Sequence, residues 1–355
     1  MTRARELANL AGVSETALSN RNLIINGAMN VAQRGTSSTS SGNHTCDRWT
    51  VNFQAFDQLA VTQSQSTTTP SGFSNSLKVE VTTAETALAA DELMYVSYRI
   101  EAQDLQHLNY GGSGAKAVTL SFWVRSSLTG KYSVLLYQDD ATRSNTKSFN
   151  ITSADTWEYK TITIDGDTAG TIDNNNGAGL SLYITLAAGA NFAGTPHSGW
   201  GAYTATDDFS FSDNVEFTAQ TGTFYLTGVQ LEVGEQATPF EHRSYGDELA
   251  ACQRYYTEIQ KASGQAINTS QTVFCGVFPT EMRATPTASL SAALTIWQLG
   301  IVGSKGQSSS NISVNSSINS GSVFNAECGN FSSLTLHTAT AVAGGDQPLK
   351  FDAEL

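Results

Sequence analysis

The stretch that decides the fold is Tyr225-Leu-Thr-Gly-Val-Gln-Leu-Glu-Val-Gly-Glu-Gln-Ala-Thr-Pro-Phe-Glu-His-Arg243. Its apolar residues share one parity, which predicts a β-strand whose buried face carries Tyr225, Thr227, Val229, Leu231 and Val233. Gly234 ends this strand, and the residues from Pro239 onward form a tail that can lie across a sandwich. A domain therefore ends here, before a helical run at 246–256.

Length and composition favour two β domains. The chain has 355 residues, of which only 14% are charged, and Ser, Thr, Asn and Gly supply its polarity. A net charge of −13 and scattered Lys and Arg residues argue against nucleic-acid binding. No apolar run is long enough to span a bilayer, and the N-terminus lacks the apolar region of a signal peptide. We therefore expect a protein made in the cytoplasm, without membrane insertion.

Residues 1–21 predict a short helical attachment arm. Arg3 and Arg5 lie among the apolar residues Leu7, Leu10 and Leu18, which fall at roughly helical spacing. A helix this short is not stable alone. Either it frays, or it docks on a partner or on its own copies.

Residues 22–244 predict a jelly-roll β-sandwich, because about ten short strands alternate with Gly, Asn and Asp turns and almost no helix appears. The expected strands are 22–35, broken at 26–27, then 46–51, 76–81, 94–100, 118–125, 132–137, 149–151, 157–164, 180–186, 215–217 and 224–233. Residues 245–355 predict a short helix and a smaller C-terminal β-sandwich. Its expected strands are 272–278, 288–290, 312–314, 322–326, 334–338 and 349–355.

The four cysteines are expected to be buried free thiols, because they lie too far apart for a metal clamp. Cys275 and Cys328 could pair only if their strands are neighbours, which the sequence does not decide.

Several motifs resemble tail-fibre and related virion proteins of tailed bacteriophages. They are Asn22-Leu-Ile-Ile-Asn-Gly, Gln33-Arg-Gly, Asp47-Arg-Trp, Thr156-Trp-Glu-Tyr-Lys-Thr-Ile-Thr-Ile-Asp-Gly, Thr227-Gly-Val-Gln-Leu-Glu-Val-Gly, Ala237-Thr-Pro-Phe-Glu-His-Arg and Cys252-Gln-Arg-Tyr-Tyr. The resemblance runs over residues 20–256. It implies a structural virion protein, specifically a tail fibre that takes part in host-surface attachment and binds other virion proteins through residues 1–21. A homotrimer is expected, since fibre heads are commonly trimers.

Three alternatives stay open at this point. The first is a head fibre or capsid decoration protein, and the second is a module that binds host surface polysaccharide. The third, a depolymerase spike, is disfavoured because no long parallel β-helix pattern appears.

The first domain also resembles, more distantly, the jelly-roll carbohydrate-binding modules found beside glycoside hydrolases. In those modules an Asp early in the last strand often helps to hold a structural calcium ion. Thr227 and Gly228 occupy that place here, which argues against the calcium.

No motif indicates catalysis, so we expect a protein that is not an enzyme and has no cofactor. Asp165, Asp167 and Asp173 lie in a run with the oxygen density of a calcium loop, but Asp, Asn and Gly also make ordinary turns. The turn is the favoured interpretation.

The best candidate for sugar contact is the Gly-rich loop at 189–203, which holds Phe192, Trp200 and Tyr203. Aromatic rings on loops are natural platforms for the apolar faces of sugar rings. The alternative is that Trp200 folds back and plugs one end of the sandwich.

Overall fold

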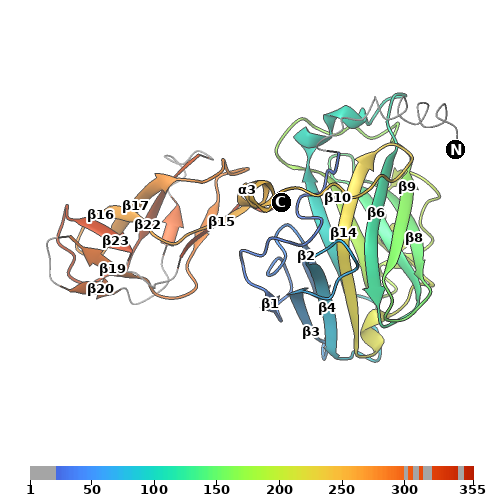
Figure 1. Ribbon diagram of the computed structural model, residues 1–355, viewed down its shortest axis with the longest axis horizontal. Helices are drawn as coiled ribbons and strands as arrows, with labels where there is room; N and C mark the ends of the chain where they lie inside the picture. The colour runs from blue at the N-terminus through green and yellow to red at the C-terminus, as the bar shows by residue number, and fades with distance from the viewer. Residues whose placement is uncertain (1–20, 300–302, 307–311, 315–321, 343–347) are drawn as a thin grey trace. The chain divides into compact units, whose positions relative to one another are not determined.

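The computed structural model describes residues 21–299, 303–306, 312–314, 322–342 and 348–355 (Figure 1). The chain divides into two units, Met1–Tyr245 and Gly246–Leu355. Residues 1–20 of the attachment arm expected at 1–21, with Arg3, Arg5, Leu7, Leu10 and Leu18, lie outside the described residues. None of the helices in the described ranges has the length and apolar character to cross a membrane.

The first unit is a sandwich of two six-stranded sheets in which every pairing is antiparallel. The β14 sheet runs in the order β1 (Ser37–Ser38), β3 (Ala60–Ser66), β4 (Ser76–Thr83), β14 (Gly222–Val233), β6 (Val118–Ser126), β9 (Glu158–Ile164). The β10 sheet runs in the order β12 (Gly201–Ala202), β8 (Arg143–Ile151), β7 (Gly130–Gln138), β10 (Ala178–Ala188), β5 (Leu93–Glu101), β2 (Thr50–Gln54). The predicted class, an all-β jelly-roll sandwich, is confirmed.

Short elements fill the connections of this unit. They are the 3-10 helices η1 (Ala102–Leu108) and η2 (Phe217–Ala219), the helix α2 (Ala205–Asp208), and the parallel pair β11 (Ala193–Gly194) and β13 (Ser210–Phe211). The strand expected at 215–217 is wrong, because Phe217 begins η2 instead.

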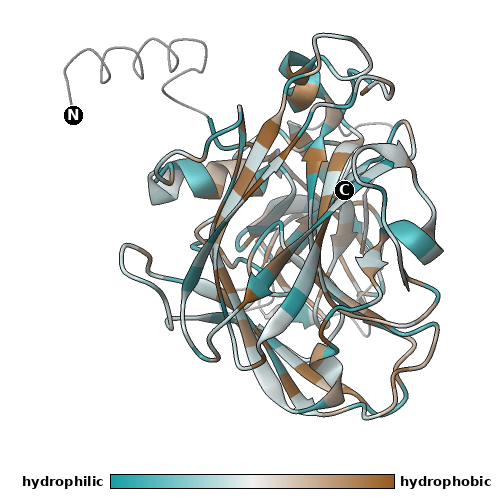
Figure 2. Cartoon of the chain, turned by 90° about the vertical axis from the view of Figure 1, so that its right-hand side faces the viewer, coloured by the Kyte–Doolittle hydropathy of each residue, from teal (hydrophilic) through white to brown (hydrophobic). Residues whose placement is uncertain are grey.

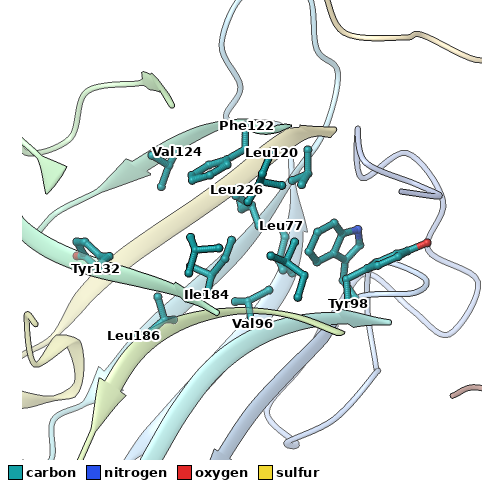
Figure 3. Packing of buried hydrophobic residues seen from close by; sticks show 14 of the residues in the cluster. Leu77, Val96, Tyr98, Leu120, Phe122, Val124, Tyr132, Ile184, Leu186 and Leu226 are labelled. Atoms are coloured by element: carbon teal, nitrogen blue, oxygen red, sulfur yellow. The ribbon is translucent and has the colours of Figure 1, made fainter. Parts of the chain in front are cut away.

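Alternation along the strands builds the core between the two sheets. Hydrophobic positions alternate with polar ones along the strands in Figure 2, and the hydrophobic side chains from both sheets meet in Figure 3. Phe122 of β6 and Leu226 of β14 come from one sheet, and Val96 of β5 and Ile184 of β10 come from the other; all four are fully buried. Truncating one such Phe to Ala typically costs about 3–5 kcal/mol.

The parity predicted for β14 is confirmed after Gly228, for Val229, Leu231 and Val233, but is wrong before it, because a β-bulge interrupts the strand. Its pairing with β6 slips between Thr227 and Gln230, and Gly228 has a φ of 61°. As a result, Leu226 joins Val229 and Leu231 in the core, whereas Tyr225 points to the other face. Glycine suits this position because it adopts a positive φ without steric cost.

The N-terminal motif fits this bulge. Residues 22–35 form turns and extended loop rather than the expected strand. Asn22 Oδ1 accepts hydrogen bonds from Ile24 N at 3.0 Å and Leu231 N at 3.1 Å, and Asn22 Nδ2 donates to Val229 O at 3.1 Å. A Cβ on Gly27 would lie 2.1 Å from Val229 O. The motifs at 22–27 and 227–234 are therefore two halves of one contact.

The tail after β14 is held by side chains on the outer face of that strand. The buried carboxylate of Glu232 accepts hydrogen bonds from Thr238 N at 2.8 Å, Thr238 Oγ1 at 2.7 Å and Gln230 Nε2 at 2.8 Å. Gln230 Oε1 accepts from Glu241 N at 2.8 Å. The Gln-Leu-Glu motif thus fixes the chain that leaves the sandwich and has a structural role.

The second unit is a smaller β-sandwich that follows the helix α3 (Tyr245–Gln253). Its β16 sheet runs in the order β20 (Ser304–Gly306), β19 (Thr295–Gln298), β23 (Ala339–Val342), β16 (Ser263–Ala266), β17 (Thr272–Val277), β22 (Val323–Cys328), β21 (Ile312–Val314). A second sheet contains β15 (Tyr256–Ile259), β24 (Leu349–Asp352) and β18 (Thr287–Ser289). Phe274, Phe324 and Phe351 pack between the two sheets. The strand expected at 334–338 is wrong, because those residues form a turn before β23.

Cys275 and Cys328 lie on neighbouring strands, as the sequence required for a disulfide, but on opposite faces of the sheet. Cys275 is exposed and Cys328 is buried, and both are free thiols. Cys46 and Cys252 are buried free thiols as well.

Candidate functional site

Tyrosines gather on the outer face of the β10 sheet. Tyr95 lies on β5, Tyr183 on β10 and Tyr137 on β7, and each alternates with side chains that enter the core. Because β5, β10 and β7 are neighbours, the antiparallel register brings these outward positions together. The Tyr95 and Tyr183 rings lie 5.2 Å apart, edge to face.

A covering loop, residues 189–214, lies over part of this face. Its Phe209 is 6% exposed, with ring centroids 5.5 Å from Tyr95 and 5.4 Å from Tyr183. Its Tyr203 lies 5.0 Å from Tyr137, edge to face. We call Tyr95, Tyr137, Tyr183 and Tyr203 together the tyrosine face.

Polar contacts hold the covering loop to β7 and β8. Thr146 Oγ1 donates a hydrogen bond to Asp208 O, and Asn214 Nδ2 donates to Ser133 Oγ at 2.7 Å. The Asp208 carboxylate is buried and accepts from Thr204 N at 2.7 Å, which closes the turn within the loop. Polar contacts therefore anchor the loop on the β7 and β8 side, while its Phe209 extends over Tyr95 on β5.

A small cavity opens where the loop meets the sheet. It has a volume of about 110 Å³ and is lined by Leu135, Tyr137, Tyr183, Tyr203 and Phe209. Pockets that enclose a drug-sized ligand span roughly 300–1,000 Å³. A molecule as large as a sugar ring must therefore bind along this face rather than inside the cavity.

Charged groups border the aromatic rings on the same face. Arg99 pairs in register with Ser181, whose Oγ donates a hydrogen bond to Asp139 Oδ2 at 2.8 Å. Burial raises the pKa of Asp139, while the Ser181 hydrogen bond and the charge of Arg99 act in the opposite direction. The exposed guanidinium of Arg99 thus stands beside a carboxyl group and two tyrosines.

The hydroxyls of Tyr95, Tyr183 and Tyr203 stay protonated at neutral pH. Burial raises the pKa of Tyr203 to about 12, with a further contribution from the neighbouring Tyr183. Burial also raises the pKa of Tyr95 and of Tyr183, and Arg99 acts against the rise in both. Each hydroxyl can therefore donate and accept hydrogen bonds.

The structure separates the three aromatic residues that the sequence grouped as a sugar platform. Tyr203 belongs to the tyrosine face, and Phe192 packs against Phe209 at 6.2 Å. Trp200 instead packs against the sandwich core, and its Nε1 donates to Asp165 O at 2.6 Å. Its ring lies 5.7 Å from Tyr110, edge to face, at the end of the sandwich.

The structure does not assemble Asp165, Asp167 and Asp173 into a ligand set. The buried Asp167 carboxylate accepts a hydrogen bond from Arg143 Nε at 2.7 Å and another from Ala169 N at 3.0 Å. Across the described part of the chain, no group of three His, Cys, Asp or Glu side chains is placed to hold a metal ion. The residues around Asp167 therefore build a turn closed by an ion pair.

Tyr95, Tyr137 and Tyr183 were missed by the sequence analysis, which searched loops for aromatic residues. A signal existed: each tyrosine lies at the parity opposite to most of the Val, Leu and Ile residues of its strand, and only Leu93 and Leu135 share its parity. Aromatic rings at the outward positions of neighbouring strands indicate a second hydrophobic cluster on that face of the sheet.

Comparison with known proteins gives similarity in fold alone. No protein-family model matches the chain, and no curated protein matches its sequence. Among solved structures, the enzymatically active domain of tailspike protein 4 of bacteriophage CBA120 is 12% identical with a TM-score of 0.34, over 60% of this chain and 21% of that chain. The match thus spans about a fifth of the length of that domain's chain.

Carbohydrate-binding modules are also among the similar structures. The family 11 module of the Clostridium thermocellum cellulase Lic26A-Cel5E is 10% identical with a TM-score of 0.29, over 57% of this chain and 98% of that chain. The N-terminal cellulose-binding domain of Cellulomonas fimi β-1,4-glucanase C is 15% identical with a TM-score of 0.30, over 58% of this chain and 100% of that chain. At these values the similarity says nothing about a ligand.

Proposed function

We propose that the first unit binds carbohydrate along the tyrosine face. The observation that carries this proposal is the alignment of Tyr95, Tyr137 and Tyr183 on neighbouring strands, with Arg99 and Asp139 beside them. A sugar presents apolar C–H faces and polar hydroxyl edges. Aromatic rings take up the former, and charged or hydroxyl groups hydrogen-bond to the latter.

The ligand is an extended saccharide chain rather than a single sugar. The cavity under the covering loop holds only about 110 Å³, so the site is a surface and not an enclosed pocket. A surface that follows several strands contacts several sugar units, and each contact adds a modest amount of binding energy. A polysaccharide or long oligosaccharide gains affinity from such a surface.

The binding experiment uses the full chain on an array of bacterial and plant glycans, followed by calorimetry on any glycan that binds. Tyr183→Ala and Tyr95→Ala should each weaken binding. Arg99→Gln should weaken the binding of glycans whose hydroxyls reach the polar end of the tyrosine face, where Arg99 and Asp139 lie. Tyr159→Ala is the matched control, because Tyr159 is 44% exposed and lies on β9 of the other sheet.

The expected weakening follows from the area that the rings offer. A tyrosine buries about 200 Å² when it is fully enclosed. A ligand that covers one exposed face of a half-buried ring removes on the order of 50 Å² from water. At about 25 cal/mol per Å², this corresponds to about 1.2 kcal/mol, or roughly eightfold in Kd. Absence of binding to any glycan, or equal losses in the Tyr159→Ala control, would refute the proposal.

We propose further that this unit is part of a bacteriophage virion protein. The motifs at 22–27, 156–166 and 227–243 support a tail fibre that attaches the particle to the host surface, and a homotrimer held on the particle through residues 1–21. A head fibre or a capsid decoration protein is the second candidate, on the same resemblance. Imaging the intact particle with a label on residues 1–20 distinguishes tail from head.

We propose binding without catalysis. The polar end of the tyrosine face offers the carboxyl of Asp139, which is hydrogen-bonded to Ser181. Incubation of the full chain with a bound polysaccharide should release no new reducing ends. Release that is abolished by Asp139→Asn would make the protein a glycosidase instead.

A further inference from the structure

A groove lies at one side of the first unit, where the edges of its two sheets meet. The strand β9 ends the β14 sheet, and β8 is the edge of the β10 sheet beyond its short pairing with β12. The strands β8 and β9 lie side by side (Figure 1). The groove between them and the covering loop has a volume of about 520 Å³. Pockets that bind small ligands span roughly 300–1,000 Å³, so this groove can hold one.

Hydroxyl groups make up much of the groove's lining. Ser148 on β8, Thr161 on β9 and Ser198 in the covering loop are exposed residues of its wall. Lys147 on β8 and Phe211 of β13 line it as well. A hydroxyl donates and accepts hydrogen bonds, and an aromatic ring offers an apolar surface. This combination matches a sugar ring, which carries hydroxyls at its edge and C–H groups on its faces.

The lysine in the groove has no counter-charge. Lys147 is half-buried, and its Nζ donates to Ser198 O at 3.0 Å, which is its one hydrogen bond among the described residues. By contrast, Lys78, Lys131 and Lys160 each form an ion pair with a carboxylate. An ammonium group has three N–H donors, so two of those on Lys147 remain for a ligand. An anionic group in the groove would form charge-assisted hydrogen bonds with them.

The neighbouring carboxylate of Asp208 is already engaged. It is 1% exposed and accepts hydrogen bonds from Thr204 N at 2.7 Å and Thr204 Oγ1 at 3.1 Å. The Nε2 atom of His197, which lines the groove, lies 3.6 Å from Asp208 Oδ1. Asp208 itself does not line the groove, and no other Asp or Glu among the described residues does. The chain carries a net charge of −13, so this groove differs from most of the surface.

We propose that this groove binds an acidic sugar, in which a carboxylate is attached to a pyranose ring. Lys147 Nζ donates to the carboxylate, and the hydroxyls of Ser148, Thr161 and Ser198 hydrogen-bond to the sugar hydroxyls. The groove is separate from the tyrosine face, although the covering loop lines both. The inference therefore does not depend on carbohydrate binding by the tyrosine face.

The first test titrates the full chain by calorimetry with the methyl glycosides of glucuronic acid and of glucose. These probes differ only at C6, which is a carboxylate in one and a hydroxymethyl group in the other. The glucuronide should bind at least about fivefold more tightly, because charge-assisted hydrogen bonds are roughly twice as strong as neutral ones. Added salt should weaken the binding of the glucuronide and leave that of the glucoside unchanged.

Acetate is the third probe, because it supplies a carboxylate without a sugar ring. It should bind more weakly than the glucuronide. Three results would overturn the proposal: no binding of the glucuronide at millimolar concentration, equal binding of the glucoside, or equal binding of acetate, which would make the groove a site for small anions.

The second test removes the charge. Lys147→Gln should abolish the preference for glucuronide over glucoside, and Thr161→Val should weaken the binding of both glycosides because it removes a hydroxyl donor. Lys116→Gln is the matched control, because it makes the same change in net charge at an exposed lysine that does not line the groove. A thermal melt establishes that each variant folds. A preference that survives in Lys147→Gln, or that falls equally in Lys116→Gln, would refute the role of Lys147.

Tyr183→Ala separates this groove from the tyrosine face. Tyr183 does not line the groove, so glucuronide binding should be unchanged in this variant. Loss of glucuronide binding in Tyr183→Ala but not in Lys147→Gln would place the acidic sugar on the tyrosine face. That result would overturn the inference and leave the proposed function intact.

Discussion

Replacing Phe209 with Ala is expected to release the covering loop from the tyrosine face. Phe209 is 6% exposed and contacts the rings of Tyr95, Tyr183 and Phe192. Truncation of a buried Phe costs about 3–5 kcal/mol, and each aromatic pair contributes about 0.5–1.5 kcal/mol. The cluster is small and the loop can settle inward, so we expect the lower end, about 3 kcal/mol. For a unit of this size, that lowers Tm by about 6–12 °C.

The assay combines a thermal melt with an ultraviolet titration of the tyrosines. Burial of Tyr203 where the loop packs on Tyr137 raises its pKa to about 12, so release of the loop should lower the pKa toward about 10. Phe192→Ala is the graded control, because the half-buried Phe192 contacts Phe209 from one side and should cost about 1 kcal/mol. If Phe209→Ala lowers Tm by less than about 3 °C, or leaves the tyrosine titration unchanged, the loop is held by its polar contacts alone.

Three further predictions concern the sandwich. Gly228→Ala should cost about 2–3 kcal/mol in urea unfolding with an unchanged m value, because Gly228 has a φ of 61° and a Cβ would lie 2.6 Å from the Phe73 ring. Glu232→Ala should cost about 3 kcal/mol, because it removes a buried carboxylate that accepts three hydrogen bonds; Glu232→Gln should cost less. Burial of Glu158 favours a higher pKa, but hydrogen bonds from Lys160 and nearby backbone groups outweigh it and lower the pKa to about 2. The stabilisation from Glu158 is thus complete above about pH 4.5 and is lost as the pH falls to about 2, and Glu158→Gln should flatten acid unfolding in that window.

The strand pattern was predictable because alternation reports burial directly. The expected strands at 118–125 and 180–186 coincide with β6 and β10, where apolar residues occupy every second position. The strand β3 was missed because its sequence, Ala-Val-Thr-Gln-Ser-Gln-Ser, is almost entirely polar. Gln63 in this strand is fully buried and donates hydrogen bonds to Ser40 O and Gly42 O, so hydrogen bonding replaces apolar burial.

The parity of β14 was not predictable from alternation, because one residue at Gly228 reverses it. Before the bulge the even positions face the core, and after it the odd positions do. A glycine within a strand is the signal for such a break, but it does not say whether the register slips. The slip is decided by Gly27 and Asn22, which approach the bulge from about 200 residues away in the sequence. Long-range contacts of this kind leave no local pattern.

The positions of the aromatic residues in the candidate site were also not predictable from local sequence. The loop at 189–203 was predicted to bind sugar because it contains several aromatic residues. The hydrogen bonds that each aromatic side chain can form determine its position instead. The Trp200 N–H donates a hydrogen bond to Asp165 O at the end of the sandwich, whereas Tyr203 lies over Tyr137 beside a cavity. A tyrosine can point its hydroxyl to solvent while its ring packs, so tyrosines are the residues that suit a half-covered sheet face. The chemistry of the site therefore follows from strand parity and from the choice of Tyr over Phe at outward positions.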